Sequence, residues 1–343
     1  MPKTIPLNSM EFCPNPTISW QQQLAHAVTS PETLLNTLGL ESDEFGDFLA
    51  ANSQFPLKVP QAYLDKIKPY TPSDPLLLQI MTQSQETVDV AGYNTDPVGD
   101  INASQLPGLL HKYHGRVLLI TTAACAVHCR YCFRRHFPYQ QQTASRDDWQ
   151  EAIKYIQQDN SIEEVILSGG DPLVLSDHKL ETLIKQLEDI PHLSRLRIHS
   201  RLPVVLPDRI TDELTEILSR SRFNVCLVIH ANHANEITGS EIKVLRKLQK
   251  AGVQLLNQAV LLNKINNLKE DQIDLSNALY NAGVLPYYLH LLDPVSGSAH
   301  FEVQLQDAKK LISKMRTKLP GFLVPKLVRE IAGENSKTPA DEL

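Results

Sequence analysis

Three cysteines lie within eight positions of one segment, TTAACAVHCRYCFRR, where Cys125, Cys129 and Cys132 follow the spacing CxxxCxxC. Three thiolates at this spacing can bind three irons of a cubane iron–sulfur cluster. The fourth iron then has no protein ligand, and an open metal position is typical of a catalytic site rather than a structural one. Arginines in the same segment would favour the thiolates and offset the negative charge of a cluster.

Two other interpretations of the cysteines stay open at this point. They could form a structural zinc site completed by His128 or His136, or they could simply pack in the core. Structural zinc ligands usually come as two separated pairs, which this segment lacks. The spacing therefore favours a cluster over zinc.

A second motif consists of Ser168, Gly169, Gly170 and Asp171, at the end of an apolar run. Glycines at the end of a strand let backbone amides approach a ligand closely. Two glycines before Pro172 are by themselves more typical of a turn. Their position one strand–helix unit after the cysteines favours a ligand site.

The segments that must position these motifs alternate between short apolar runs and amphipathic stretches. Continuous apolar strands separated by helices indicate a parallel sheet that is buried on both faces. Six such units predict an α/β fold, either a partial (βα)6 barrel or a doubly wound sheet, and in either one ligands gather at the carboxyl ends of the strands. The expected strands begin at Arg116, Glu163, Ser194, Asn224, Val253 and Val284, and helices are expected to open at Ser176 and Thr211.

The regions on either side of this alternation differ from it in pattern. Residues 1–110 have helical segments such as SWQQQLAHAV and PETLLNTLGL, residues 111–318 form the barrel, and residues 319–343 are rich in Pro and Gly. We therefore expect a mostly helical N-terminal region and an irregular C-terminal strap that crosses the mouth of the barrel.

Composition excludes several classes of protein. A formal net charge of -6 over 343 residues argues against a general nucleic-acid surface. The chain has no apolar run long enough for a membrane span or a secretory signal, so a cytoplasmic protein is expected. An odd count of 5 cysteines fits a reducing compartment, and Cys13 and Cys226 are expected to be structural.

Long stretches of the chain resemble the lysine 2,3-aminomutase family of radical S-adenosylmethionine enzymes. They include HKYHGRVLLITTAACAVHCRYCFRR, LSGGDPLVL, RIHSRLPVVLPDRIT, IHANHANEIT, NQAVLLNKIN and ENSKTP. The resemblance implies a partial barrel that binds a 4Fe-4S cluster, S-adenosylmethionine and pyridoxal 5'-phosphate. In it, Cys125, Cys129 and Cys132 hold the cluster, and the segment Ser168 to Asp171 meets the amino group of S-adenosylmethionine.

The resemblance also assigns residues to pyridoxal phosphate. Lys337 matches the lysine to which that cofactor is attached, and its tail must then fold back over the cavity. Lys112, Tyr113 and Arg116 match the residues that bind the phosphate, although Lys112 replaces a more usual arginine and so lacks the bidentate fork.

For the substrate, L-lysine, the resemblance assigns Arg134 to the carboxylate, because a guanidinium offers two parallel donors. Asp293 and Glu330 match the acidic pair that recognises the distal ammonium, which favours lysine over glutamate. His230 and Gln258 match positions close to the adenosyl group and the aminated substrate carbon.

The expected reaction removes hydrogen from C3 of lysine with a radical and moves the amino group from C2 to C3. Tyr131 in place of the usual His, and the absence of cysteines after Cys226, resemble the branch that makes (R)-β-lysine for elongation factor P and its lysyl-transferring ligase. The expected electron donor is a flavodoxin or ferredoxin. The alternatives are an enzyme that releases free (S)-β-lysine, a glutamate 2,3-aminomutase, and a non-catalytic zinc or electron-transfer protein.

Overall fold

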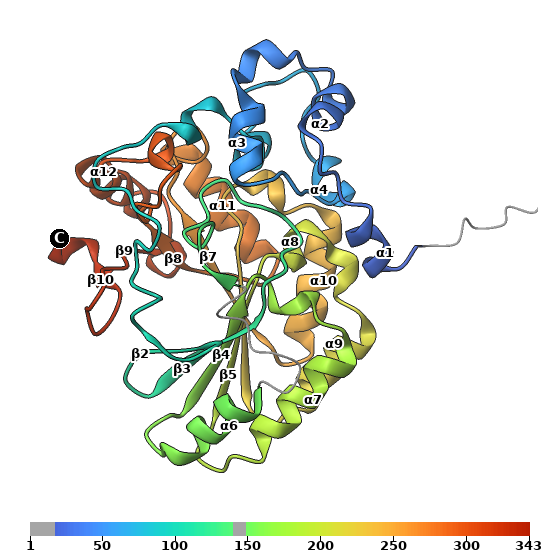
Figure 1. Cartoon of the computed structure of the whole chain (residues 1–343), viewed down its shortest axis with the longest axis vertical. Helices are drawn as coiled ribbons and strands as arrows, with labels where there is room; N and C mark the ends of the chain where they lie inside the picture. Colours follow the sequence, from blue (N-terminus) through green and yellow to red (C-terminus); the bar gives the residue numbers. More distant parts are fainter. Residues whose placement is uncertain (1–17, 140–148) are drawn as a thin grey trace, which may run out of the picture.

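The computed structural model of the chain describes residues 18–139 and 149–343. Its centre is one ten-stranded sheet in which the strands are neighbours in chain order and the two edge strands do not meet (Figure 1). β3 to β9 run parallel, while β1, β2 and β10 pair antiparallel at the edges. The strands are β1 (Ser104–Leu106), β2 (Leu109–Tyr113), β3 (Arg116–Thr122), β4 (Glu164–Gly169), β5 (Arg195–Ser200), β6 (Asn224–Ile229), β7 (Gln254–Val260), β8 (Leu285–His290), β9 (Lys326–Arg329) and β10 (Thr338–Pro339).

The six predicted strands are confirmed as β3 to β8. In β4 all residues from Val165 to Gly169 are buried, whichever face of the sheet they point to. Burial on both faces explains why the sequence shows continuous apolar runs instead of alternation. The sheet stays open, so the barrel is partial, as expected.

Helices connect the parallel strands and cover the outer face of the sheet (Figure 1). The predicted N-caps are confirmed, because Ser176 accepts a hydrogen bond from the backbone of Lys179 and Thr211 accepts one from that of Leu214. These helices are α6 (Trp149–Gln158), α7 (Asp177–Glu188), α8 (Leu202–Val205), α9 (Asp212–Arg220), α10 (Gly239–Lys250), α11 (Lys269–Asn281) and α12 (Leu305–Arg316).

The N-terminal region is helical, as predicted, and packs on the barrel. Its helices are α1 (Trp20–Ala25), α2 (Pro31–Leu38), α3 (Phe48–Gln54) and α4 (Gln61–Leu64). Lys66 joins it to the barrel, since its Nζ donates to the Val204 carbonyl at 2.7 Å and pairs with Glu241 at 3.1 Å. Leu34, Leu57 and other buried side chains of this region belong to the same apolar core as the sheet.

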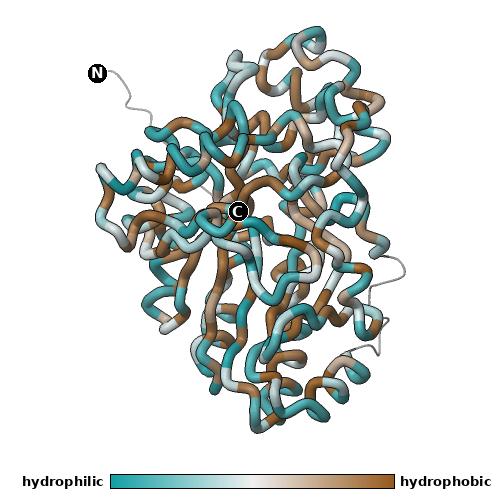
Figure 2. The backbone as a smooth tube through the Cα atoms, turned by 90° about the vertical axis from the view of Figure 1, so that its left-hand side faces the viewer, coloured by the Kyte–Doolittle hydropathy of each residue, from teal (hydrophilic) through white to brown (hydrophobic). Residues whose placement is uncertain are grey.

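The C-terminal segment is more regular than the expected strap. β9 extends the sheet beside β8, and β10 folds back on β9 with Thr338 opposite Arg329. The open edge of β8 supplies the unpaired backbone groups that β9 needs. In Figure 2 the C-terminus lies across the viewed face of the molecule, in front of hydrophobic strand segments.

Cys13 lies outside the described residues. Cys226 lies within β6 and is partly buried. No helix in the described part of the chain has the length and apolar character to cross a membrane.

Candidate active site

A cavity of about 1220 Å³ opens at the carboxyl ends of the parallel strands and is closed on one side by the C-terminal segment. It exceeds the roughly 300–1,000 Å³ of a typical single-ligand pocket, so it has room for more than one small molecule. Fourteen of the predicted site residues line it: Cys125, Cys129, Cys132, Lys112, Tyr113, Arg116, Arg134, Gly170, Asp171, His230, Gln258, Asp293, Glu330 and Lys337. Ser168 and Gly169, the other two predicted site residues, do not line the cavity.

The cysteine loop follows β3 and is held by the N-terminal region. The Arg130 amide donates to the Gln79 carbonyl at 2.9 Å, and the His128 amide donates to the Lys58 carbonyl at 3.0 Å. Within the loop, the Cys132 amide donates to the Cys129 carbonyl at 3.0 Å. The N-terminal region therefore fixes the backbone that carries the thiols.

Burial favours the protonated form of the Cys125 and Cys132 thiols. It raises the pKa of Cys125, and it raises that of Cys132 to about 11, with neighbouring cysteine charges adding to both effects. Because metals bind the thiolate form, cluster assembly must displace these protons. The donor set, thiols that share one cavity, suits iron–sulfur chemistry.

The histidines proposed to complete a zinc site are engaged elsewhere. His128 Nδ1 lies 2.8 Å from the Pro56 carbonyl, and His136 Nε2 lies 3.1 Å from the Ser296 carbonyl. In residues 18–139 and 149–343, no three side chains of Cys, His, Asp or Glu are grouped as a single metal ion requires. Cysteines of a cluster each bind a different iron and need not converge on one point.

The two glycines after β4 are required by close packing against the cysteine loop. The Gly170 amide donates to the Thr122 carbonyl at 2.7 Å, and a Cβ at Gly170 would lie 2.2 Å from the Ala124 carbonyl oxygen. Gly169 has a φ of 123°, and a Cβ there would lie 2.6 Å from the Thr122 oxygen. The glycines therefore seat the cysteine loop on the sheet.

The Asp171 carboxylate holds the start of α8. It accepts hydrogen bonds from Ser200 Oγ at 2.7 Å and from the amides of Arg201 at 2.8 Å and Leu202 at 3.2 Å. Ser168 Oγ accepts from Arg134 Nη1 at 3.3 Å. The Asp171 carboxylate thus stabilises the backbone at the start of α8, and the residue also lines the cavity.

Five charged side chains form an alternating chain along one wall of the cavity. Asp100 pairs with Arg134 Nε at 2.7 Å and with Lys112 Nζ at 2.5 Å. Lys112 also pairs with Glu330 at 3.0 Å, and Glu330 pairs with Lys337. The structure therefore brings together Arg134, Lys112, Glu330 and Lys337, which sequence reasoning placed in four different roles. Asp100, which joins two of them, was missed.

Asp293 and Glu330 have opposite electrostatic surroundings. Asp293 Oδ1 is buried and has no hydrogen-bond partner among the described residues. Burial, followed by the negative charge of Glu330, raises the pKa of Asp293 to about 7. Burial also opposes ionisation of Glu330, but the charges of Lys337 and Lys112 outweigh it and lower the pKa of Glu330. The cavity thus contains one paired and one unpaired carboxyl group.

Four predicted site residues remain: His230, Arg116, Tyr113 and Gln258. His230 Nε2 lies 2.8 Å from the Tyr131 hydroxyl, and burial with a nearby arginine charge lowers the pKa of His230 to about 3. The Arg116 guanidinium lies over the Tyr113 ring at 4.6 Å. Gln258 faces the cavity from β7.

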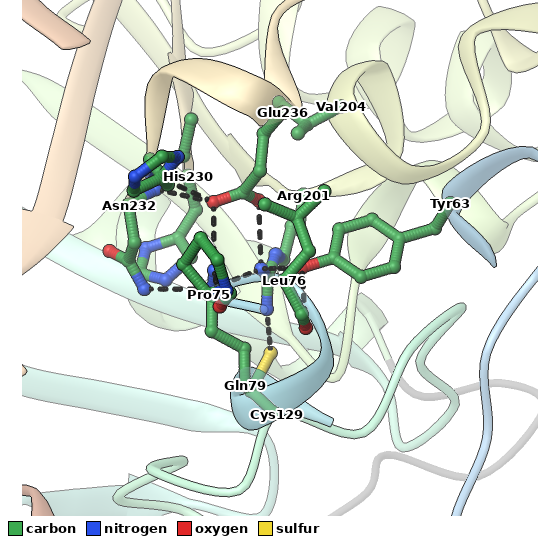
Figure 3. Close-up of polar contacts among 12 residues, drawn as sticks. Tyr63, Pro75, Leu76, Gln79, Cys129, Arg201, Val204, His230, Asn232 and Glu236 are labelled. Carbon is green, nitrogen blue, oxygen red and sulfur yellow. Dashed lines mark hydrogen bonds and ion pairs between the residues drawn. The ribbon is translucent and has the colours of Figure 1, made fainter. Parts of the chain in front are cut away.

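Arg201 is a second residue that sequence reasoning missed. Its Nη1 donates to Cys129 Sγ at 2.7 Å, and its Nη2 contacts Gln79 and Glu236 (Figure 3). The signal was present, because Arg201 directly follows β5 and the carboxyl ends of strands form the site.

The open parallel sheet with a three-cysteine loop after its first parallel strand defines a radical S-adenosylmethionine protein, and residues 119–273 match the model of the Radical SAM superfamily. L-lysine 2,3-aminomutase from Escherichia coli is 48% identical over 94% of this chain and 94% of its own length. The protein of the same name from Haemophilus influenzae is 48% identical over 93% of this chain and 95% of its length, and that from Clostridium subterminale is 35% identical over 93% and 77%. The chain belongs to the L-lysine 2,3-aminomutase family, and this membership implies a 4Fe-4S cluster and S-adenosylmethionine.

Proposed function

We propose that this protein is a lysine 2,3-aminomutase that converts L-lysine into (R)-β-lysine for the modification of elongation factor P. One observation carries the proposal: a single cavity brings three thiols together with the Lys337 amine and the carboxyl groups of Asp293 and Glu330. The names of the relatives from E. coli and H. influenzae, which match nearly the whole chain, support the same activity.

The cofactors supply the reactive species: a radical that can remove hydrogen from an unactivated carbon, and a π system in pyridoxal phosphate through which nitrogen can migrate. Cys125, Cys129 and Cys132 would bind the cluster. Lys337 would attach pyridoxal phosphate covalently, and a primary amine inside the cavity is the group that this attachment needs.

The phosphate of that cofactor would be held by a cluster of donors beside the cavity. Lys112 and Arg116 bring positive charge there, and Tyr113 brings a hydroxyl group. Lys112 already neutralises Asp100 and Glu330, so Arg116 would supply more of the charge for the phosphate.

The substrate would lie between two charged ends of the cavity. Arg134 would bind the carboxylate of lysine, since within the described residues its Nη1 makes a long contact to Ser168, at 3.3 Å, while its Nε holds Asp100. Asp293 and Glu330 would bind the distal ammonium. A cation between them removes the repulsion that raises the pKa of Asp293, which favours lysine over glutamate.

Other side chains would orient the reacting groups. Burial keeps His230 neutral, so its ring can accept or donate a hydrogen bond without adding charge near the cluster. Gln258 would offer a neutral amide to the same part of the cavity. Gly170 lies in the cavity wall after β4, where its backbone would face S-adenosylmethionine.

The assignment to the elongation factor P branch rests on Tyr131 within the cysteine motif, which replaces the usual His. The proposed partners are L-lysine, a flavodoxin or ferredoxin as electron donor, and the ligase that transfers β-lysine to elongation factor P. Reduced, clustered cysteines suit a cytoplasmic location.

The test is a single reaction with a chiral readout. The anaerobically reconstituted protein, with about four irons per chain, is incubated with L-lysine, S-adenosylmethionine, pyridoxal phosphate and dithionite. We expect the β-lysine that forms to be the R enantiomer. An S product would overturn the elongation factor P assignment alone, and an intact cluster without any β-lysine would overturn the aminomutase assignment.

A further inference from the structure

Arg201 places a buried positive charge against one of the cluster cysteines. Its guanidinium is 7% exposed, and its Nη1 donates to Cys129 Sγ at 2.7 Å. Arg201 follows β5 directly, and its backbone amide is held by Asp171 at 2.8 Å. Both the backbone and the tip of this side chain are therefore fixed.

Neighbouring groups aim the guanidinium at the sulfur (Figure 3). Nη2 donates to Gln79 Oε1 at 2.7 Å and to Glu236 Oε2 at 2.9 Å. Glu236 is held in turn by the amides of Asn232 at 2.8 Å and His233 at 3.0 Å. With Nη2 held by two acceptors, rotation of the guanidinium away from Cys129 would break buried hydrogen bonds.

The charges of this group are arranged asymmetrically about the sulfur. The negative charge of Glu236 balances the positive charge of Arg201, which offsets part of the free-energy cost of burying both groups. The positive nitrogen, however, is the atom in contact with Cys129, and the carboxylate lies on the other terminal nitrogen. The sulfur therefore experiences a positive charge at close range.

We propose that Arg201 is a positioning residue that sets the reduction potential of the cluster, by donating a hydrogen bond to the Cys129 sulfur. The cluster gains one electron from an external one-electron donor, and no bond or proton changes at Arg201. Hydrogen bonds to cluster sulfurs stabilise the added negative charge and raise the potential. The inference requires the cluster that family membership implies, and it goes beyond the aminomutase reaction.

The test measures the reduction potential in the absence of S-adenosylmethionine, pyridoxal phosphate and lysine. The double variant Arg201→Gln with Glu236→Gln removes both charges of the pair and keeps polar side chains in place. At the midpoint potential of the wild-type cluster, we expect the ratio of reduced to oxidised cluster in the double variant to be at least about tenfold lower than in the wild-type protein. This change is equivalent to about 59 mV for one electron. The ratio is read from electron paramagnetic resonance during a redox titration.

A matched control is available in another buried ion pair. Arg209 pairs with Asp177 at 2.7 Å and is fully buried, but neither residue lines the cavity. The double variant Arg209→Gln with Asp177→Asn should keep the wild-type potential. A wild-type potential in the Arg201 variant, with its iron content intact, would overturn the inference.

If the double variant does not fold, the single variant Glu236→Gln provides a second test. Its ratio of reduced to oxidised cluster is expected to change in the opposite direction. Glu236→Gln leaves the charge of Arg201 unbalanced beside Cys129, so the ratio of reduced to oxidised cluster should rise at the same potential. An unchanged or lower ratio would contradict the inference. Formation of β-lysine is scored separately, so a failure of the proposed function does not affect this result.

Discussion

Lysine should bind this protein more tightly above pH 7 than below it, because one carboxyl group of the acidic pair is protonated at neutral pH. Burial and the charge of Glu330 raise the pKa of Asp293 from 3.8 to about 7. Its Oδ1 has no hydrogen-bond partner within the described residues, so an incoming cation would add to the more distant charges of Lys337 and Lys112 in stabilising its ionised form. Binding of an ammonium and ionisation of Asp293 are therefore coupled.

The size of the effect follows from the pKa of Asp293. Near pH 8 about nine in ten Asp293 groups are ionised, and near pH 6 about one in ten, so the affinity for lysine should fall about tenfold. The ammonium of lysine stays charged throughout, with a pKa of about 10.4. Burial lowers the pKa values of His199, His230 and His290, three histidines that line the same cavity as Asp293, to well below this range.

Calorimetric titration of lysine into protein free of pyridoxal phosphate and S-adenosylmethionine measures this affinity without turnover. The Asp293→Asn variant should bind weakly and show little dependence on pH. Asp341→Asn, at the rim of the same cavity, is the matched control and should keep the tenfold change. Equal affinity at pH 6 and pH 8 in the wild-type protein would refute the assignment of Asp293.

Three further perturbations have defined outcomes. Asp100→Asn breaks a buried salt bridge and should lower the free energy of unfolding by urea by about 3–5 kcal/mol. Glu163→Gln, in an exposed pair, should lower it by less than about 1 kcal/mol. Similar losses in the two variants would contradict the buried network. Gly170→Ala drives a Cβ into the cysteine loop and should lower both the melting temperature and the iron bound per chain, while Gly239→Ala meets nothing within 4 Å and should change neither. Lys337→Gln removes the ammonium that now pairs with Glu330, so this variant should bind lysine more tightly than the wild-type chain when both lack pyridoxal phosphate; weaker binding by calorimetry would show that the paired amine does not compete with substrate.

The parts of the fold that the sequence predicts are those governed by local patterns. β3, β4 and β6 appear as apolar runs because a parallel sheet buries both faces of a strand. Ser176 and Thr211 mark helix starts because their side chains replace the missing backbone partners of the first turn. These signals act over a few residues and need no tertiary information.

The parts that escaped prediction depend on contacts between distant segments. Asp100 lies in a segment without any motif, and its importance comes from Arg134 and Lys112, which only the folded chain brings to it. Gln79 and Arg201 are 122 positions apart and meet only because the N-terminal region packs over the strand ends. The pairing of β9 with β8 was missed for a similar reason, since a Pro-rich tail carries no alternating pattern of its own.

The open edge of the sheet connects the fold with the proposed chemistry. A closed barrel would have paired β8 with β3 and left no edge for β9. Because β8 is free, β9 adds beside it and β10 turns back, which places Glu330 and Lys337 on opposite arms of one turn and in contact with each other. The cysteines sit on the loop after β3, at the other end of the same row of strands. The partial barrel thus allows one cavity to be walled by a cluster-binding loop on one side and an amine-bearing tail on the other.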